Sequence, residues 1–262
     1  MDTRRQFGLI ILALFAAFGA VTAQAQVDQS ALARQLLAGN VRERDDALET
    51  ARALAPQQIG SELRAALIQV LERGNHVREL QYEAGRRGET LAAADDAEFV
   101  VHVSWVVAAL GDPRAIPALI GALGTGALPT RALVNFGEQA APALLAAVRT
   151  PTTMHYIVDE ALIALRFLVE GKGPQPLVAG TLSDIRLAAK LRLTGKQYFT
   201  TLWHAIDLAI ALKDPELRQI VQSLASDREE VLARGIKESE VPETQRRAAQ
   251  RLAGVPAEPV EP

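Results

Sequence analysis

Residues 110–119 read Leu-Gly-Asp-Pro-Arg-Ala-Ile-Pro-Ala-Leu, and residues 136–144 read Phe-Gly-Glu-Gln-Ala-Ala-Pro-Ala-Leu. An apolar-Gly-acid step recurs after 26 residues, and a Pro-Ala-Leu step recurs after 25. Gly111 and Gly137 can adopt the left-handed backbone that ends a helix. Asp112 can cap the helix that follows, and the prolines suit a first helical turn, where a missing N–H costs least. Each segment therefore predicts the end of one helix and the start of the next.

The residues after each turn form one apolar helix face. Apolar positions there are spaced by three, four and seven residues, as on one side of an α-helix: Ile116, Leu119, Ile120 and Leu123, then Ala141, Leu144, Leu145 and Val148. Another apolar segment precedes each turn, at 99–110 and at 128–136. A helix pair cannot bury its faces alone, so neighbouring pairs are expected to stack around one continuous core. Leu119 and Leu144 are predicted to occupy equivalent buried positions.

The composition favours helices over strands. Hydrophobic residues make up 49% of the 262 residues but aromatics only 5%, so most of the apolar content is Ala, Leu and Val. Cysteine is absent, which excludes disulfides, thiolate metal sites and cysteine nucleophiles. The expected fold is all-α, an α-solenoid of stacked antiparallel helix pairs.

Residues 109–119 resemble the signature of short HEAT repeats, the type also found in phycobilisome-lyase-like proteins. Residues 40–51 resemble the second helix of such a repeat, and residues 213–217 echo the helix start. The resemblance is good only over 99–149. The resemblance implies an armadillo/HEAT-like superhelix with a concave binding surface. The helix pairs expected at both ends of the chain are an extrapolation from residues 99–149.

The sequence predicts helical repeats over 26–170 and over 177–254, separated by the Gly- and Pro-rich stretch 171–176. The second block is expected to continue the array of the first. An insertion is expected at about 74–97, where apolar residues are few. It is interpreted either as a functional or mobile segment or as a solvated connector with a short helix at 77–84. Amphipathic helices are expected at 58–73 and 154–169, and C-terminal helices at 197–212, 215–225, 227–236 and 243–252. Residues 255–262 contain three prolines and two glutamates and predict a disordered tail.

The N-terminus has the three-part layout of a secretory signal peptide over residues 1–25. Two arginines precede the uncharged stretch 7–21, which the small-x-small tripeptide 23–25 follows. The apolar run is shorter than the roughly 20 residues needed to span a bilayer, so cleavage is expected between Ala25 and Gln26. This predicts a periplasmic or exported protein, by the general secretory or the twin-arginine route. The alternative is an adaptor tethered to the inner membrane by an uncleaved N-terminal helix.

The charge balance argues against two classes of partner. Without Asp2, Arg4 and Arg5, 26 basic and 30 acidic residues remain, a net charge of −4. An acidic chain lacks the electrostatic footprint of a nucleic-acid-binding protein and has no polybasic patch for a membrane surface. No nucleic-acid partner is expected, and membrane contact is expected only through an uncleaved signal segment.

Motifs for catalysis, cofactors and metals are missing from the sequence. A P-loop around Gly195-Lys196 fails at Lys190 and Gln197, and no histidine belongs to a His-x-x-x-His or His-Glu-x-x-His motif. His155 and Asp159, one helical turn apart, could share a cation, but a local hydrogen bond or exposed pair is the preferred interpretation. The sequence thus predicts no cofactor, no metal and no catalytic residue.

Basic and aromatic groups remain as candidate binding residues. Three arginines lie near a predicted helix end: Arg246, Arg247 and Arg251. The helix dipole favours positive charge at that end, which explains their position. The alternative interpretation is that they bind an anion. The densest aromatic group covers residues 198–203. Core packing is its default interpretation, and a partner pocket is the alternative, because Tyr and Trp are enriched at interface hot spots. The candidate partner-binding residues are Tyr156, Tyr198 and Trp203.

Together these features predict an exported, non-enzymatic scaffold or adaptor that binds a protein or peptide in the cell envelope. The alternative from a different class is an enzyme or enzyme subunit of the lyase-like HEAT type, since a shared scaffold does not fix function.

Overall fold

The structure is a computed structural model that describes residues 27–91, 97–151 and 153–254. Within these ranges it is helical with no strand, which confirms the expected all-α class. The predicted signal peptide at 1–25, its cleavage point at Ala25 and Gln26, and the predicted tail at 255–262 lie outside the described residues.

Thirteen α-helices follow one another in the described residues. In chain order they are α2 (Gln29–Ala38), α3 (Val41–Ala53), α4 (Ser61–Arg86), α5 (Ala97–Ala109), α6 (Ile116–Gly121), α7 (Ala127–Phe136), α8 (Ala141–Arg149), α9 (His155–Val169), α10 (Ala179–Thr194), α11 (Phe199–Leu212), α12 (Pro215–Ser226), α13 (Arg228–Ala233) and α14 (Val241–Leu252). Short 3-10 turns precede several of them: η1 (Pro56–Gln58), η2 (Pro113–Ala115), η3 (Gly137–Gln139) and η4 (Glu238–Glu240).

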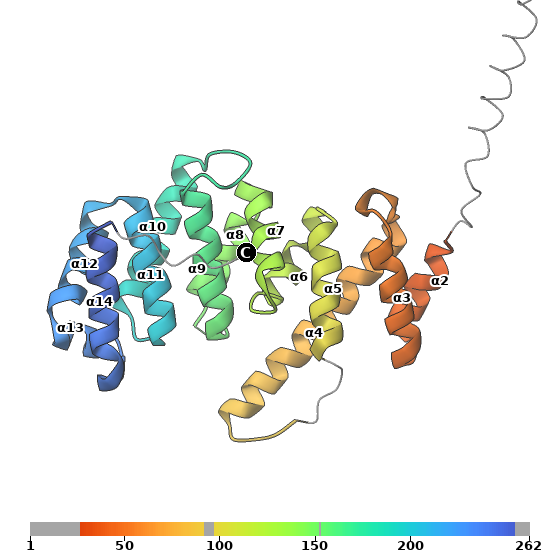
Figure 1. Ribbon diagram of the computed structural model, residues 1–262, viewed down its shortest axis with the longest axis horizontal. Helices are drawn as coiled ribbons and strands as arrows, with labels where there is room; N and C mark the ends of the chain where they lie inside the picture. The colour runs from red at the N-terminus through yellow and green to blue at the C-terminus, as the bar shows by residue number, and fades with distance from the viewer. Residues whose placement is uncertain (1–26, 92–96, 152, 255–262) are drawn as a thin grey trace, which may run out of the picture.

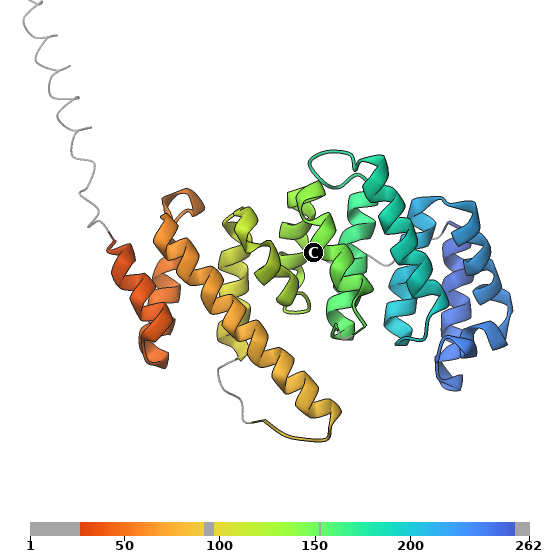
Figure 2. The ribbon, with the colours of Figure 1, turned by 180° about the vertical axis from the view of Figure 1, so that it is seen from behind.

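The helices form a row of two layers (Figures 1 and 2). One layer holds α3, α5, α7, α9, α11 and α14, and the other holds α2, α4, α6, α8, α10 and α12. Contacts are concentrated between helices adjacent in the chain and between successive helices of one layer, so α9 packs on α7, α8 and α11. The arrangement is a stack of helix pairs and is compatible with an α-solenoid.

The core is a hydrophobic seam between the two layers. Leu119 on α6 and Leu144 on α8 are both 0% exposed, which confirms their predicted burial. Leu162 and Leu165 on α9 and Leu202 on α11 continue the seam toward the C-terminal end and are also fully buried. One buried cluster therefore runs through the array rather than a separate core in each half.

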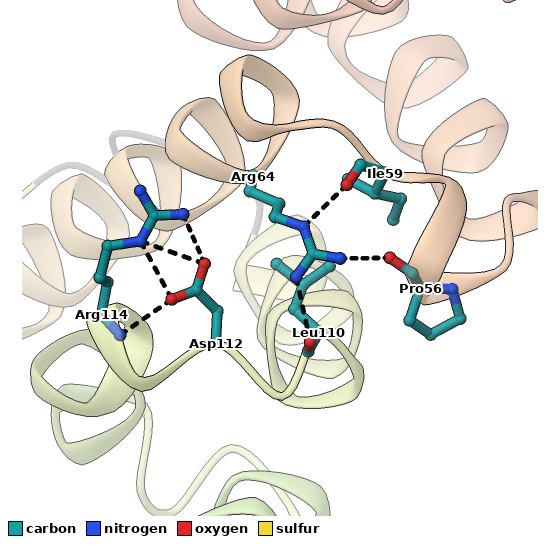
Figure 3. A network of polar contacts seen from close by, with 6 residues as sticks. All are labelled: Pro56, Ile59, Arg64, Leu110, Asp112 and Arg114. Atoms are coloured by element: carbon teal, nitrogen blue, oxygen red, sulfur yellow. Dashed lines mark hydrogen bonds and ion pairs between the residues drawn. The ribbon is translucent and has the colours of Figure 1, made fainter.

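The turn between α5 and α6 forms as its sequence predicts (Figure 3). Gly111 has a φ of 60°, and the Asp112 carboxylate accepts the backbone N–H of Arg114 at 3.0 Å. The same carboxylate pairs with the Arg114 guanidinium at 2.6 Å. These hydrogen bonds from Arg114 lower the pKa of Asp112, although its burial opposes them. A buried acid thus stays ionised and caps η2, the 3-10 turn that leads into α6.

Arg64 on α4 ties this turn to the preceding helix pair (Figure 3). Its guanidinium donates to the carbonyl of Leu110 at 3.2 Å and to that of Ile59 at 2.7 Å, and it also donates to the carbonyl of Pro56. Carbonyls at the end of a helix have no partner within that helix, so the arginine satisfies the end of α5 from the neighbouring layer.

The two related turns share the left-handed backbone but differ in their caps. Gly137 has a φ of 58°, but the Glu138 that follows it accepts the backbone N–H of Val178 at 3.3 Å and so caps the more distant helix α10. At the third turn Lys213 adopts the left-handed backbone with a φ of 54°, and Asp214 caps α12. The echo of the motif at 213–217 is therefore a genuine helix end and start.

The expected helix end at residue 73 and the separate short helix at 77–84 are wrong. Helix α4 continues without a break to Arg86, so neither a connector nor a separate helix at 77–84 begins at Gly74. A Cβ at Gly74 would lie 2.7 Å from Cγ2 of Val100 on α5. The glycine is present because the two helices approach closely there, and it does not end a helix.

Helix α10 was not among the predicted C-terminal helices. It buries Ile185, Ala188, Ala189 and Leu193, but Leu187 and Leu191 on its outer side are 59% and 47% exposed. Apolar residues all round the helix remove the one-sided pattern by which an amphipathic helix is recognised.

Candidate binding site

The second half of α4 projects from the row of helices, as Figures 1 and 2 show. Side chains fix its near end to the last turn of α6. Asn75 Nδ2 donates to the carbonyl of Ala118 at 2.7 Å, and Arg78 donates to the carbonyl of Gly121 at 3.4 Å. The carbonyl of Ala118 also accepts the backbone N–H of Ala122 at 3.0 Å, so Asn75 gives it a second donor. The two side chains join α4 to the last turn of α6 and so orient the projecting part of α4.

Four aromatic rings meet where α4 reaches α9 and α11. We call Tyr82, His155, Tyr156 and Tyr198 the aromatic cluster; it contains all three tyrosines of the chain. His155 lies 4.3 Å from Tyr198 and 6.1 Å from Tyr82 between ring centroids, and Tyr82 meets Tyr156 edge-on at 6.0 Å. The Tyr82 hydroxyl and His155 Nδ1 are 3.3 Å apart. Residues from three helices therefore form one continuous aromatic surface.

The aromatic cluster is partly open to solvent. Tyr198 is 55% exposed, and the other three rings are partly buried. Burial raises the pKa of the Tyr82 phenol, and the neighbouring Tyr198 raises it further, so the phenol is neutral at physiological pH. The guanidinium of Arg78 lies 5.5 Å from the centre of the Tyr156 ring, within the range of a cation–π interaction.

A cleft of about 360 Å³ lies beside the aromatic cluster. Helix α4 forms one wall with Glu72, Asn75, His76 and Glu79. Helix α6, the connection after α8 and the start of α9 form the remainder, which includes Pro117, Met154 and Ile157. The Tyr156 hydroxyl donates to the sulfur of Met154 at 2.7 Å, so the cleft and the aromatic cluster share a boundary.

A larger cavity of about 840 Å³ lies among the ends of α9 to α12 and α14. Its two arginines already have partners within the chain. Arg186 pairs with Asp214 at 2.7 Å, and Arg251 pairs with Asp207 at 2.8 Å. These internal pairs leave less charge for a ligand than the smaller cleft does, where Glu79 is paired, among the described residues, only with the exposed His76, at 3.8 Å.

Trp203 does not join the other two candidate residues. Its Nε1 donates to the hydroxyl of Thr244 at 3.2 Å, and Arg247 covers its ring at 5.1 Å. Both partners belong to α14, so Trp203 holds α14 against α11. The structure thus brings Tyr156 and Tyr198 together and places Trp203 in a packing contact elsewhere.

The predicted arginine group at 246–251 has internal partners. Arg247 and Arg251 both pair with Asp207, at 2.7 and 2.8 Å, and Asp207 is 2% exposed. Arg246 donates to Glu243 at 2.9 Å, one turn earlier on the same helix. The anion-site interpretation is therefore corrected: a buried carboxylate of α11 takes the place that a bound anion would fill.

The predicted local pair of His155 and Asp159 does not form either. His155 turns to the aromatic cluster, while Asp159 accepts the hydroxyl of Thr200 at 2.7 Å and also that of Thr201. His204 faces Asp159 and Asp207, but burial dominates and lowers its pKa. Within the described ranges no group of three or more His, Asp or Glu side chains is arranged to hold a metal ion.

Sequence reasoning missed Tyr82 and the α4 wall of the cleft. Asn75, Arg78 and Tyr82 are three and four residues apart and share one helix face, which would have indicated a contact surface had α4 been recognised as continuous. Among the described helices, none combines the length and the apolar character needed to cross a bilayer. Comparisons with protein-family models, curated proteins and solved structures give no match.

Proposed function

We propose that this chain is an exported, non-enzymatic scaffold of the HEAT-like α-solenoid type that binds a protein or peptide partner in the cell envelope. The observation that carries the proposal is the aromatic cluster, in which helices distant in sequence present their tyrosines at one open site. Tyr198, at 55% exposure, is its most accessible member.

The physical support comes from the character of tyrosine at interfaces. A tyrosine ring buries a large area at a low cost in side-chain entropy, and its hydroxyl tolerates both water and a partner. A handful of such residues commonly supplies most of the binding energy of an interface. The hydrogen bonds of α4 to α6 hold Tyr82 in place before binding, which lowers the ordering cost of association.

Export is the second part of the proposal, and it rests on the layout of residues 1–25. Mass spectrometry of the N-terminus of the protein purified from its native cell tests it. A mature chain that starts at Gln26 agrees with cleavage and export. A chain that retains its first residues and fractionates with the inner membrane contradicts cleavage and supports the tethered alternative.

A photo-crosslinking amino acid at position 198 tests the binding site. We expect a discrete crosslinked partner from cell-envelope material, and about tenfold weaker capture of that same partner by Tyr198→Ala used as bait, as for a hot-spot residue. Leu187 on α10, 59% exposed and in the other layer, is the matched control position for the crosslinker. Equal crosslinking from positions 187 and 198, or undiminished capture by Tyr198→Ala, contradicts the proposal.

A further inference from the structure

The cleft beside the aromatic cluster has an apolar floor and an acidic rim. Pro117, Met154 and Ile157 supply apolar surface, and Glu72 and Glu79 supply the carboxylates. No lysine or arginine is among the residues that line it. The cleft therefore offers negative charge at its opening and hydrophobic contact within.

The polar wall of the cleft also has the character of an acceptor. The Oδ1 atom of Asn75 is buried and has no hydrogen-bond partner among the described residues, because the amide is oriented by the bond from its Nδ2 to Ala118. A buried acceptor without a donor is costly. The ionised carboxylates of Glu72 and Glu79 on the same wall are acceptors as well, so a ligand that brings N–H donors is favoured over one that brings acceptors.

We infer that this cleft binds a lysine or arginine side chain of the partner, and the inference rests on the proposed function. The aliphatic stem of such a side chain packs on apolar surface while its charged end stays at the edge, which matches the floor and rim of the cleft. Glu72 and Glu79 are seven residues apart on α4, about 10 Å along the helix axis. His76 lies between them, and its Nδ1 is 3.8 Å from a carboxylate oxygen of Glu79. The cationic group enters between the two carboxylates.

The other ligand classes fit the cleft less well. An anionic side chain would meet the two carboxylates at the rim, and like charges repel. A purely apolar side chain would bury part of the rim without giving the carboxylates a partner. The neighbouring aromatic cluster accommodates apolar residues that flank the basic one, so the partner segment is basic and apolar in character.

Met154 makes the inference directly testable, because the chain contains only two methionines, Met1 and Met154. The methyl NMR signal of Met154 reports on the floor of the cleft. The probe is the peptide Ala-Leu-Lys-Leu-Ala, and the matched peptide carries norleucine in place of lysine, which keeps the stem and removes the charge. We expect the lysine peptide to shift the Met154 signal, and the norleucine peptide to need about ten times the concentration.

Charge variants show whether the two carboxylates are responsible. The variant Glu72→Gln/Glu79→Gln should lose the preference for lysine over norleucine. The matched control is Asp46→Asn/Glu49→Gln on α3, which removes the same charge from exposed positions and should keep the preference. Higher salt should weaken only the binding of the lysine peptide, because the rim is open to solvent.

Several results would overturn the inference. They are an unmoved Met154 signal, equal affinity for the two peptides, or equal loss of preference in the two double variants. A Met154 shift that appears with protein concentration alone would assign the cleft to a second copy of this chain instead. If Tyr198→Ala still weakens partner capture in any of these cases, the proposed function stands and only the assignment of the cleft fails.

Discussion

Replacing Asp207 with asparagine keeps the shape of a buried side chain but removes the charge that two arginines share. Asp207 on α11 is 2% exposed and pairs with Arg247 and Arg251 of α14, which are 20% and 10% exposed. Removing one partner of a buried ion pair costs about 3–5 kcal/mol, because it leaves uncompensated charge. Arg247 retains some access to water, so the lower end of this range applies, about 3 kcal/mol.

The matched control is Asp184→Asn. Asp184 pairs with Arg149 at 2.8 Å, the same distance, but their side chains are 53% and 41% exposed. An exposed pair of this kind contributes less than about 1 kcal/mol. Comparing the two variants therefore isolates the effect of burial at a constant pair distance.

Urea unfolding followed by circular dichroism measures both free energies. In a Trp105→Phe background the emission of Trp203 reports locally, because Arg247 and Thr244 of α14 contact its ring. We expect Asp207→Asn to shift this emission to the red as α14 loosens. The triple variant Asp207→Leu/Arg247→Met/Arg251→Met should recover most of the lost stability, because no buried charge remains. Equal costs for Asp207→Asn and Asp184→Asn would refute the reasoning.

Three further predictions concern the core, helix α4 and a buried acid. Leu119→Ala and Leu144→Ala should each lower the free energy of unfolding by about 2–5 kcal/mol, because both side chains are fully buried. The control, Leu187→Ala at an exposed position, should change it by less than about 0.5 kcal/mol. Thermal melts that do not separate the control from the two core variants would contradict the packing. Gly85→Ala should stabilise the fold by about 0.5–1 kcal/mol, since a Cβ there meets nothing within 4 Å. Gly74→Ala should destabilise the fold by about 1–3 kcal/mol, because its Cβ would clash with Val100. If urea unfolding gives both changes the same sign, the close approach of α4 and α5 is contradicted. Burial raises the pKa of Glu160, so the wild-type chain loses stability as the pH rises from the ordinary pKa of 4.5 through the raised pKa. Glu160→Gln should therefore be more stable than the wild type at about pH 7 but not at about pH 4. A gain in stability of equal size at both pH values would argue against a raised pKa.

The fold could be predicted where its determinants are local. A glycine with positive φ at a helix end is specified within a few residues, so the sequence locates the turns at Gly111 and Gly137 correctly. The capping acid is local only at Asp112, because Glu138 caps the distant helix α10. Gly74 could not be interpreted from local sequence, because its role depends on Val100, which only the folded chain brings near. Helix α10 was missed for a related reason, since exposed leucines conceal which of its sides is buried.

The candidate site could be predicted only in part. Tyr156 and Tyr198 were singled out because tyrosine is common at interfaces, but their meeting depends on how α9 stacks against α11. Tyr82 joins them through an overhang of α4 that the sequence alone had divided at Gly74. Trp203 was a candidate for the same reason, because Trp is also common at interfaces, but it packs in the contact between α11 and α14. Residue type therefore suggested candidates, and only packing separated them.

The confinement of contacts to adjacent helices has a consequence for how the molecule comes apart. Each internal helix pair packs against the pairs on both sides of it, whereas a terminal pair packs against only one. Unfolding of a terminal pair therefore removes one interface between pairs and leaves the other interfaces intact. Such an array unravels progressively from its ends, and amide protons in the middle exchange more slowly than those in α2 or α14. The aromatic cluster draws on α4, α9 and α11, none of which is a terminal helix, so loss of α2 or α14 removes a neighbour of the cluster but no member of it.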